Sequence, residues 1–354
     1  MSIQHYLIQM IHRILSALDN NSRRETFAVV ANLIDWNNAF PRQCPKLGVD
    51  SFIKNGVRPA LIPVLINYFQ DRKMSVKWHG CRSVLRDIHG GGPQGATLGI
   101  LEYLSQSNDN ADLVSEDFCF EFVDDLSVLE IVDLLTVGLT SYNLKLHVPS
   151  DIDVHNQYIP ANNLKSQTWL DEINQWTVKQ KMLINEKKTK NLIFNFTDKY
   201  QFSTRLTINN QLIEVLRSTK LLGTIISDDL SWDLNTLNLV KKANARMELV
   251  RKVASFGASE DDLKDIYFLF VRSLLEQSAT VWHSSLTQEN IEDLERVQKS
   301  AVKIILGPKY NGYKKSLIKL YMESLKERRE FLCLTFVQKC LKNPNTKKMF
   351  SENK

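Results

Sequence analysis

The spacing of apolar residues changes near Trp232, and this change divides the chain into two parts. Before it, apolar residues occur in short runs typical of strands, separated by turn residues and a few helical segments. After it, apolar residues recur every three or four positions in three successive stretches, 240–254, 263–274 and 291–304. This spacing predicts amphipathic helices. We therefore predict an α+β fold in which a sheet-containing domain, residues 1–232, precedes a helical domain, residues 233–345, and a tail, residues 346–354.

Two segments of the first part place carboxylates at the ends of strands. Residues 27–34 are almost all apolar and are followed at once by Asp35, which predicts a buried strand with a carboxylate at its C-terminal end. Residues 119–129 alternate between apolar and other residues, are interrupted by Asp124 and Asp125, and then resume. This second pattern predicts a β-hairpin with two adjacent carboxylates at its tip.

The other elements of the first part follow from the same rules. We expect helices over 2–18, 57–69 and about 168–182, a short hairpin over 73–84 and a loop over 145–165. Strands are expected over 191–196, over 205–215 with a bend at Asn209 and Asn210, and over 221–227. Thr168 followed three residues later by Asp171 resembles a capping box, which predicts that the third helix begins at Thr168.

The charge of the chain is unevenly distributed. From Arg296 to Lys354 there are 15 Lys and Arg side chains against 4 Asp and Glu, with aromatic residues interleaved. This pattern is expected of a surface that binds phosphate backbones, and it includes Lys314, Lys315 and Lys319. Taken alone, such a charge run is more typical of a solvated helical face.

Cysteine, histidine and hydropathy patterns exclude several classes of protein. The five cysteines are scattered and form no C-x-x-C pair, and the histidines form no pair at ligand spacing, so neither a disulfide framework nor a zinc site is expected. No apolar run approaches the ~18 residues that a membrane helix needs, and the N-terminus lacks a signal-peptide pattern. We expect an intracellular protein of the cytoplasm or nucleus.

The three acidic residues Asp35, Asp124 and Asp125 are the strongest candidates for chemistry. Carboxylates held at strand ends can converge on a pair of Mg²⁺ ions, which favour carboxylate, water and phosphate oxygens. Two such ions clamp the attacking and leaving oxygens of a phosphoryl or nucleotidyl transfer. An Asp-Asp pair alone is weak evidence, because Asp is common in turns.

Further segments occur in a fixed order along the chain, namely Asp35–Phe40, Gly91–Gly95, Phe122–Asp125, Asn185–Lys190 and Lys220–Gly223. Together they resemble the palm motifs, lettered A to E, of the reverse transcriptases of non-LTR retrotransposons. The resemblance covers most of the chain. It implies a right-hand polymerase palm, an antiparallel sheet with flanking helices, followed by an α-helical thumb.

The resemblance also implies roles for the acidic residues and one lysine. Asp35 and Asp124 would ligate two Mg²⁺ ions, with Asp125 supporting them. Lys188 would protonate the pyrophosphate leaving group, although neighbouring lysines make a solvated basic edge an equally simple interpretation.

Other residues would contact the nucleotide and the primer. By the same resemblance, Phe40 is the steric gate that excludes the ribose 2′-hydroxyl, with ordinary core packing as the alternative. The incoming nucleotide would be supported by Gly92, Pro93, Gln94 and Gly95. Leu222 and Gly223 would form the primer grip.

The implied reaction is RNA-directed DNA synthesis, with an RNA template, a DNA primer and dNTPs as partners and the oligomeric state left open. Only 34 residues precede Asp35, so the resemblance implies a truncated copy without complete fingers. Two alternatives remain: a catalytically silent nucleic-acid-binding remnant, and a two-metal nuclease or phosphatase. The latter leaves the segment Gly91–Gly95 and the helical part unexplained.

Overall fold

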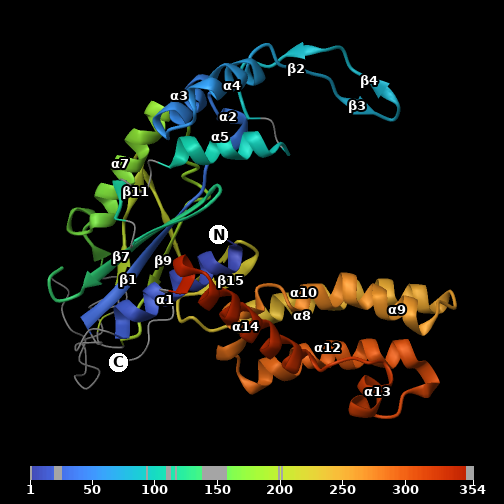
Figure 1. The fold of residues 1–354 in the computed structure, drawn as a ribbon. Helices are drawn as coiled ribbons and strands as arrows, with labels where there is room; N and C mark the ends of the chain where they lie inside the picture. The colour runs from blue at the N-terminus through green and yellow to red at the C-terminus, as the bar shows by residue number, and fades with distance from the viewer. Residues whose placement is uncertain are drawn as a thin grey trace. The chain divides into compact units, whose positions relative to one another are not determined.

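The computed structural model describes residues 2–19, 26–92, 95–108, 113–115, 118–137, 158–197, 200 and 202–347. The chain separates into two compact units, Arg13–Arg217 and Met1–His12 with Ser218–Lys354, and the division crosses the first helix, α1 (Ile3–Asp19). Figure 1 shows their elements as a ribbon. The first unit contains the main sheet and the second is mostly helical, which confirms the predicted α+β class. The domain boundary at residue 232 stays a prediction.

A five-stranded sheet forms the centre of the first unit. Its strand order is β13-β9-β1-β7-β6. The strands are β1 (Phe27–Ile34), β6 (Cys119–Phe122), β7 (Asp125–Asp133), β9 (Lys190–Phe194) and β13 (Glu214–Leu216). All neighbours are antiparallel except β13 and β9. The predicted buried strand over 27–34 and the hairpin over 119–129 are therefore both confirmed.

One face of this sheet packs against helix α7 (Lys165–Gln180). Ala28, Val30 and Ile34, alternate residues of the central strand, share a buried core with Ile173 and Trp176 of the helix. Alternate side chains of a strand point to one face, so the apolar run over 27–34 supplies this core with every second residue.

Helix α7 begins earlier than the sequence predicts. The expected capping box at Thr168 and Asp171 is wrong: Thr168 lies inside the helix, and the N-cap residue, Leu164, makes no side-chain cap bond. Instead, the Glu130 carboxylate on β7 accepts hydrogen bonds from the N–H groups of Lys165, at 2.8 Å, and Ser166, at 2.7 Å. A carboxylate at a helix N-terminus satisfies free N–H donors and complements the helix dipole.

Short helices and a β-ribbon complete the first unit. The helices are α2 (Ala39–Arg42), α3 (Pro45–Lys54), α4 (Ile62–Phe69) and α5 (Thr97–Ser107), with a 3-10 turn at Pro59–Leu61. Val49, Phe52, Leu65 and Phe69 form a small core of their own between α3 and α4. The ribbon contains β2 (Lys73–Met74), β3 (Lys77–Trp78), β4 (Cys81–Arg82) and β5 (Arg86–Asp87), close to the predicted hairpin.

Hairpins take the place of the bent strand predicted over 205–215 and of the strand predicted over 221–227. Residues 205–215 contain β11 (Thr207–Ile208) and β12 (Gln211–Leu212), which pair with each other, before β13 begins. Residues 218–227 contain β14 (Ser218–Leu221) and β15 (Thr224–Ser227). In both cases the two central turn residues have positive φ, which tight hairpins of this type require. Short strands β8 (Tyr158–Ile159) and β10 (Ser203–Thr204) pair separately, after a 138–157 segment outside the described residues.

The second unit confirms the helical spacing after Trp232. Its helices are α8 (Asp233–Ser255), α9 (Glu260–Ile266), α10 (Ser273–Leu275), α11 (Ala279–Trp282), α12 (Gln288–Leu306), α13 (Tyr313–Lys319), α14 (Leu325–Lys342) and α15 (Pro344–Lys347). A π-helical turn, Tyr267–Arg272, joins α9 to α10. Residues at the predicted spacing, among them Ala243, Met247 and Val250 of α8, are fully buried in its core.

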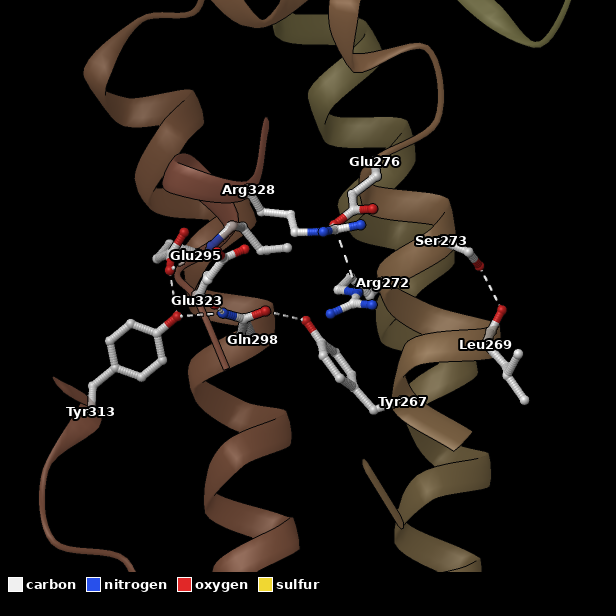
Figure 2. A network of polar contacts seen from close by, with 11 residues as sticks. Tyr267, Leu269, Arg272, Ser273, Glu276, Glu295, Gln298, Tyr313, Glu323 and Arg328 are labelled. Carbon is white, nitrogen blue, oxygen red and sulfur yellow. Dashed lines mark hydrogen bonds and ion pairs between the residues drawn. The ribbon is translucent and has the colours of Figure 1, made fainter. Parts of the chain in front are cut away.

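A polar network crosses this helical core (Figure 2). The Tyr267 hydroxyl donates to Gln298 Oε1 at 2.6 Å, and Gln298 Nε2 donates to the Tyr313 hydroxyl at 2.9 Å and to the Glu323 carbonyl at 2.8 Å. The Tyr313 hydroxyl in turn donates to Glu295 Oε1. Buried hydrogen-bonded networks of this kind favour one arrangement of the helices, because any unpaired member is costly.

None of the helices among the described residues is both long and apolar enough to cross a membrane.

Candidate active site

Two of the predicted carboxylates meet at one end of the sheet because of strand register. In the antiparallel pair β1 and β7, Ile34 lies opposite Leu126. One step further along this register, Asp35 follows β1 and Asp125 begins β7, so the two residues are neighbours on adjacent strands. Asp35 is further fixed through its backbone, since its N–H donates to Thr189 Oγ1 at 3.3 Å and its carbonyl accepts from the Asn185 N–H at 2.8 Å.

The third carboxylate lies in the turn that joins β6 to β7. Phe122 pairs with Asp125, so Val123 and Asp124 are the two turn residues. Val123 has φ of 57°, a left-handed conformation that is strained for a β-branched side chain. The turn leaves Asp124 exposed, whereas Asp125 is half-buried. Strain of this kind persists only where the surroundings enforce it, here at the tip that carries the carboxylates.

Burial and neighbouring charge raise the pKa values of Asp35 and Asp125. Burial, followed by the charges of Asp124 and Asp35, raises the pKa of Asp125 to about 6. Burial also raises the pKa of Asp35, with a further contribution from Asp124 and an opposing one from Lys188. Neighbouring negative charge therefore disfavours the charged forms of Asp35 and Asp125.

Lys188 contacts this cluster. Its Nζ lies 4.0 Å from Asp35 Oδ2, and both side chains are largely accessible, at 70% and 41%. Surface ion pairs of this kind contribute little to stability. The contact therefore leaves a cation near the carboxylates in a weak ion pair.

The donor chemistry of the cluster fits a divalent cation. Asp35 Oδ2 is buried and accepts no hydrogen bond from any described residue, and neighbouring carboxylates with raised pKa values gain from a positive charge. Among the described residues, however, no three His, Cys, Asp or Glu side chains form a ready-made metal group. Mg²⁺ is usually held by one or two carboxylates together with waters and substrate phosphates, so a protein cage is not required.

The glycine segment of the predicted nucleotide site is anchored to α2 and its flanks. The Gly91 N–H donates to the Gln43 carbonyl at 2.8 Å, and the Gly92 N–H donates to the Phe40 carbonyl at 2.9 Å. Arg72 Nη2 donates to the Gly91 carbonyl at 2.5 Å. These bonds hold the backbone of Gly92 against that of Phe40, so two predicted nucleotide contacts lie close together.

Gly92 leaves no room for a side chain. A Cβ at this position would lie 1.8 Å from Gln43 Oε1, and Gln43 is itself buried. Gly95 is exposed with φ of 81°, a conformation that favours glycine. The other two predicted residues of this segment, Pro93 and Gln94, lie outside the described residues.

Phe40 is half-buried and packs on Tyr103 of α5, with ring centroids 5.1 Å apart. Tyr103 is fully buried, and burial with the nearby charges of Glu121, Asp124 and Asp125 raises its pKa. Tyr103 is therefore a neighbour of the carboxylate cluster that sequence reasoning missed. Its position inside a helical pattern gave no signal, because only the fold brings α5 beside the β6–β7 turn.

The remaining predicted residues belong to the second unit. Leu222 and Gly223 are the turn between β14 and β15, with φ of 47° and 89°. A Cβ at Gly223 would lie 2.5 Å from Gln277 Nε2, so this turn packs closely on the helical part. Lys314, Lys315 and Lys319 are all exposed on α13.

A comparison with curated proteins identifies one relative. The RNA-directed DNA polymerase from mobile element jockey of Drosophila funebris is 24% identical over 253 residues, which are 69% of this chain and 24% of that protein. The chain is similar to a retrotransposon reverse transcriptase. This similarity to an enzyme confirms the resemblance seen in the sequence motifs, and the chain spans about a quarter of the relative's length. No protein-family model matches the chain.

Two solved structures are also similar. The telomerase of Candida tropicalis, in complex with the TWJ fragment of telomeric RNA, gives a TM-score of 0.41 at 12% identity and covers 90% of this chain and 52% of that one. The corresponding telomerase complex of Candida albicans gives 0.38 at 11% identity, over 93% and 56%. Because both TM-scores are below 0.5, we base no argument on them.

Proposed function

We propose that this chain is the palm and thumb of an RNA-directed DNA polymerase, with the palm in residues 1–232 and the thumb in 233–345. The observation that carries the proposal is the meeting of Asp35, Asp124 and Asp125 at one end of the sheet, where burial and neighbouring charge raise the pKa values of Asp35 and Asp125. The similarity to a retrotransposon polymerase supports nucleotidyl transfer as the reaction class.

Asp35 and Asp124 would hold two Mg²⁺ ions, with Asp125 beside them. When bound, these ions supply positive charge at the attacking primer 3′-hydroxyl and at the pyrophosphate that leaves the dNTP. The role of the protein is to hold the carboxylates ready: Asp35 by the fixed register of β1, and Asp124 by the strained turn after Val123.

Other residues would orient the nucleotide and handle its protons. Lys188, whose Nζ lies 4.0 Å from Asp35 Oδ2, would give a proton to the departing pyrophosphate. Phe40, supported by Tyr103, would fill the space that a ribose 2′-hydroxyl needs and so select dNTPs. The backbone of Gly92 and Gly95, together with Pro93 and Gln94, would support the nucleotide and the template base.

The helical unit would hold the primer–template. Leu222 and Gly223 form a tight turn suited to contact the primer end, and Lys314, Lys315 and Lys319 present exposed charge to phosphates. Reversing these three lysines to Glu is expected to weaken duplex binding and flatten its dependence on salt. Unchanged binding and an unchanged salt slope would contradict this role.

The direct test is extension of a labelled DNA primer on an RNA template, with dNTPs and Mg²⁺. Template-dependent lengthening that EDTA abolishes supports the proposal. Binding without any lengthening would instead identify a silent nucleic-acid-binding protein, and metal-dependent shortening of the primer would identify a nuclease; either result overturns it.

A further inference from the structure

The β-ribbon of the first unit, residues 73–87, is unusually exposed. It projects beyond α4 (Figure 1), and every residue from 76 to 87 is solvent-exposed. Its turn residues, His79 and Gly80, have φ of 44° and 83°, as a tight two-residue hairpin requires. A two-stranded ribbon without a covering layer is only marginally stable in water. Its exposed position is therefore not explained by a contribution to stability.

Large apolar side chains are exposed along this ribbon. Met74, Val76 and Trp78 alternate along its first half, with exposed fractions of 55%, 60% and 73%. Val84 and Leu85 add exposures of 74% and 67% on the returning strand. The Trp78 and His79 rings are perpendicular, at 4.9 Å between ring centroids. At 73% exposure the indole has most of its surface open to solvent.

One face of the ribbon carries unbalanced positive charge. Lys77 and Arg82 are direct cross-strand partners, an arrangement of like charges that destabilises a ribbon. Within the described part of the chain, neither side chain makes an ion pair or hydrogen bond. Arg86 is the cross-strand partner of Met74 and so lies on the same face as Met74. The one carboxylate of the ribbon, Asp87, faces Lys73 at 3.7 Å. An anion bound across Lys77 and Arg82 would remove their repulsion.

The base of the ribbon is joined to the predicted nucleotide site. The Arg72 carbonyl accepts from the Ile88 N–H at 2.8 Å and closes the ribbon. The Arg72 side chain donates from Nη2 to the Gly91 carbonyl. A ligand held by the ribbon is therefore anchored next to the glycine segment of the same unit.

We propose that the ribbon is a binding arm for single-stranded nucleic acid. Lys77 and Arg82 contact phosphates, and an unpaired base stacks on Trp78. The charge of the basic face selects a polyanion, and the open indole selects an unstacked base over a duplex, in which every base face is already covered. The inference stands without polymerase activity, because it concerns binding alone.

The test measures binding of the full chain to a fluorescein-labelled 20-nucleotide uridine RNA by anisotropy at several salt concentrations. The variant Lys77→Gln with Arg82→Gln is expected to lose about tenfold in affinity and to reduce the slope of log affinity against log salt by about 1.4. Trp78→Ala is expected to lose about tenfold with the slope unchanged. RNA is expected to quench the tryptophan fluorescence of wild type, and the extent of this quenching should be smaller in Trp78→Phe.

Matched controls keep the test specific. Lys46→Gln with Lys179→Gln removes the same charge from exposed sites elsewhere in the unit, and Phe256→Ala removes an aromatic side chain that is 86% exposed. Both are expected to bind as wild type does. The proposal is overturned if the ribbon variants bind RNA as tightly as these controls do. It is also overturned if the chain binds duplex more tightly than single strand, or if Trp78 is needed for self-association while RNA binding is unchanged.

Discussion

The Nζ of Lys188 lies 4.0 Å from Asp35 Oδ2, across the end of the strand that carries Asp35. The Asn185 N–H donates to the Asp35 carbonyl at 2.8 Å, so the segment that carries Lys188 is tied to the end of this strand. The ion pair itself is too exposed to matter for stability, and its interest is chemical.

Lys188 is expected to act by giving up a proton rather than by its charge alone. Lys188→Ala should slow primer extension by ~10²-fold, the lower end for general acid catalysis. Lys188→Arg should be slowed as much, because a guanidinium keeps its proton at neutral pH. Single-turnover extension rates give the comparison, with Lys187→Arg as the control. Rescue by arginine would mean that charge suffices and that no proton is transferred.

Gly92 is expected to tolerate no side chain. Its Cβ would lie 1.8 Å from Gln43 Oε1, so Gly92→Ala should destabilise the first unit by about 1 to 3 kcal/mol. Gly90→Ala is the control, since its Cβ would meet only the Gln43 carbonyl oxygen at 3.8 Å. Shortening Gln43 to Ala in the same chain should recover part of the loss. Urea denaturation measures each value, and equal effects at positions 90 and 92 would refute the crowding.

Much of this fold follows from local patterns. The central strand over 27–34 and the Asp124–Asp125 hairpin were predicted because burial and alternation are written directly into neighbouring residues. The start of α7 was missed because its cap, Glu130, comes from a distant strand. At Asn209–Asn210 the pattern predicted a bend in one strand, whereas the structure has a tight turn between two strands. The turn at Leu222–Gly223 was expected as a hairpin only from the family resemblance, because two residues are too short an interruption to show in the apolar pattern.

The candidate site shows the same limit. The carboxylates could be predicted from the sequence because acidic residues follow or interrupt recognisable strand patterns. Lys188 could be predicted because it belongs to one of the motifs that resemble those of reverse transcriptases. Gln43, Arg72 and Tyr103 could not, since their roles depend on which helix packs beside the glycine segment and the turn. Tertiary contacts between distant segments leave no periodic trace in the chain.

Stability is expected to depend on pH through Glu102. This carboxyl is fully buried on α5, and burial raises its pKa from 4.5 to about 7, against the opposing charge of Arg72. The folded state therefore binds more protons between these values, and stability falls as pH rises through that window. Between pH 4.5 and pH 8, the free energy of unfolding of wild type should fall by up to ~3 kcal/mol relative to that of Glu102→Gln. Parallel pH profiles in urea denaturation would contradict this.

The Gln298 network is expected to hold the helical unit together (Figure 2). Gln298→Leu leaves the buried Tyr267 hydroxyl without its acceptor, which should cost about 1 to 3 kcal/mol. Adding Tyr267→Phe removes the stranded hydroxyl and should recover part of the loss. Gln288→Ala, on the exposed surface of the same helix, is the control. Hydrogen exchange in α12 reports the effect, and a double variant no more stable than Gln298→Leu would argue against the network.

The central claim is that Asp35, Asp124 and Asp125 form the catalytic carboxylates of a polymerase. The decisive measurement is the rate of Mg²⁺-dependent primer extension by Asp124→Asn, compared with wild type and with Asp50→Asn, an exposed carboxylate on α3 away from the cluster. Asp124 is exposed in its turn, so the folded structure should survive the substitution. The account predicts extension by wild type and Asp50→Asn and at least ~10²-fold less by Asp124→Asn. Equal rates in all three would contradict it.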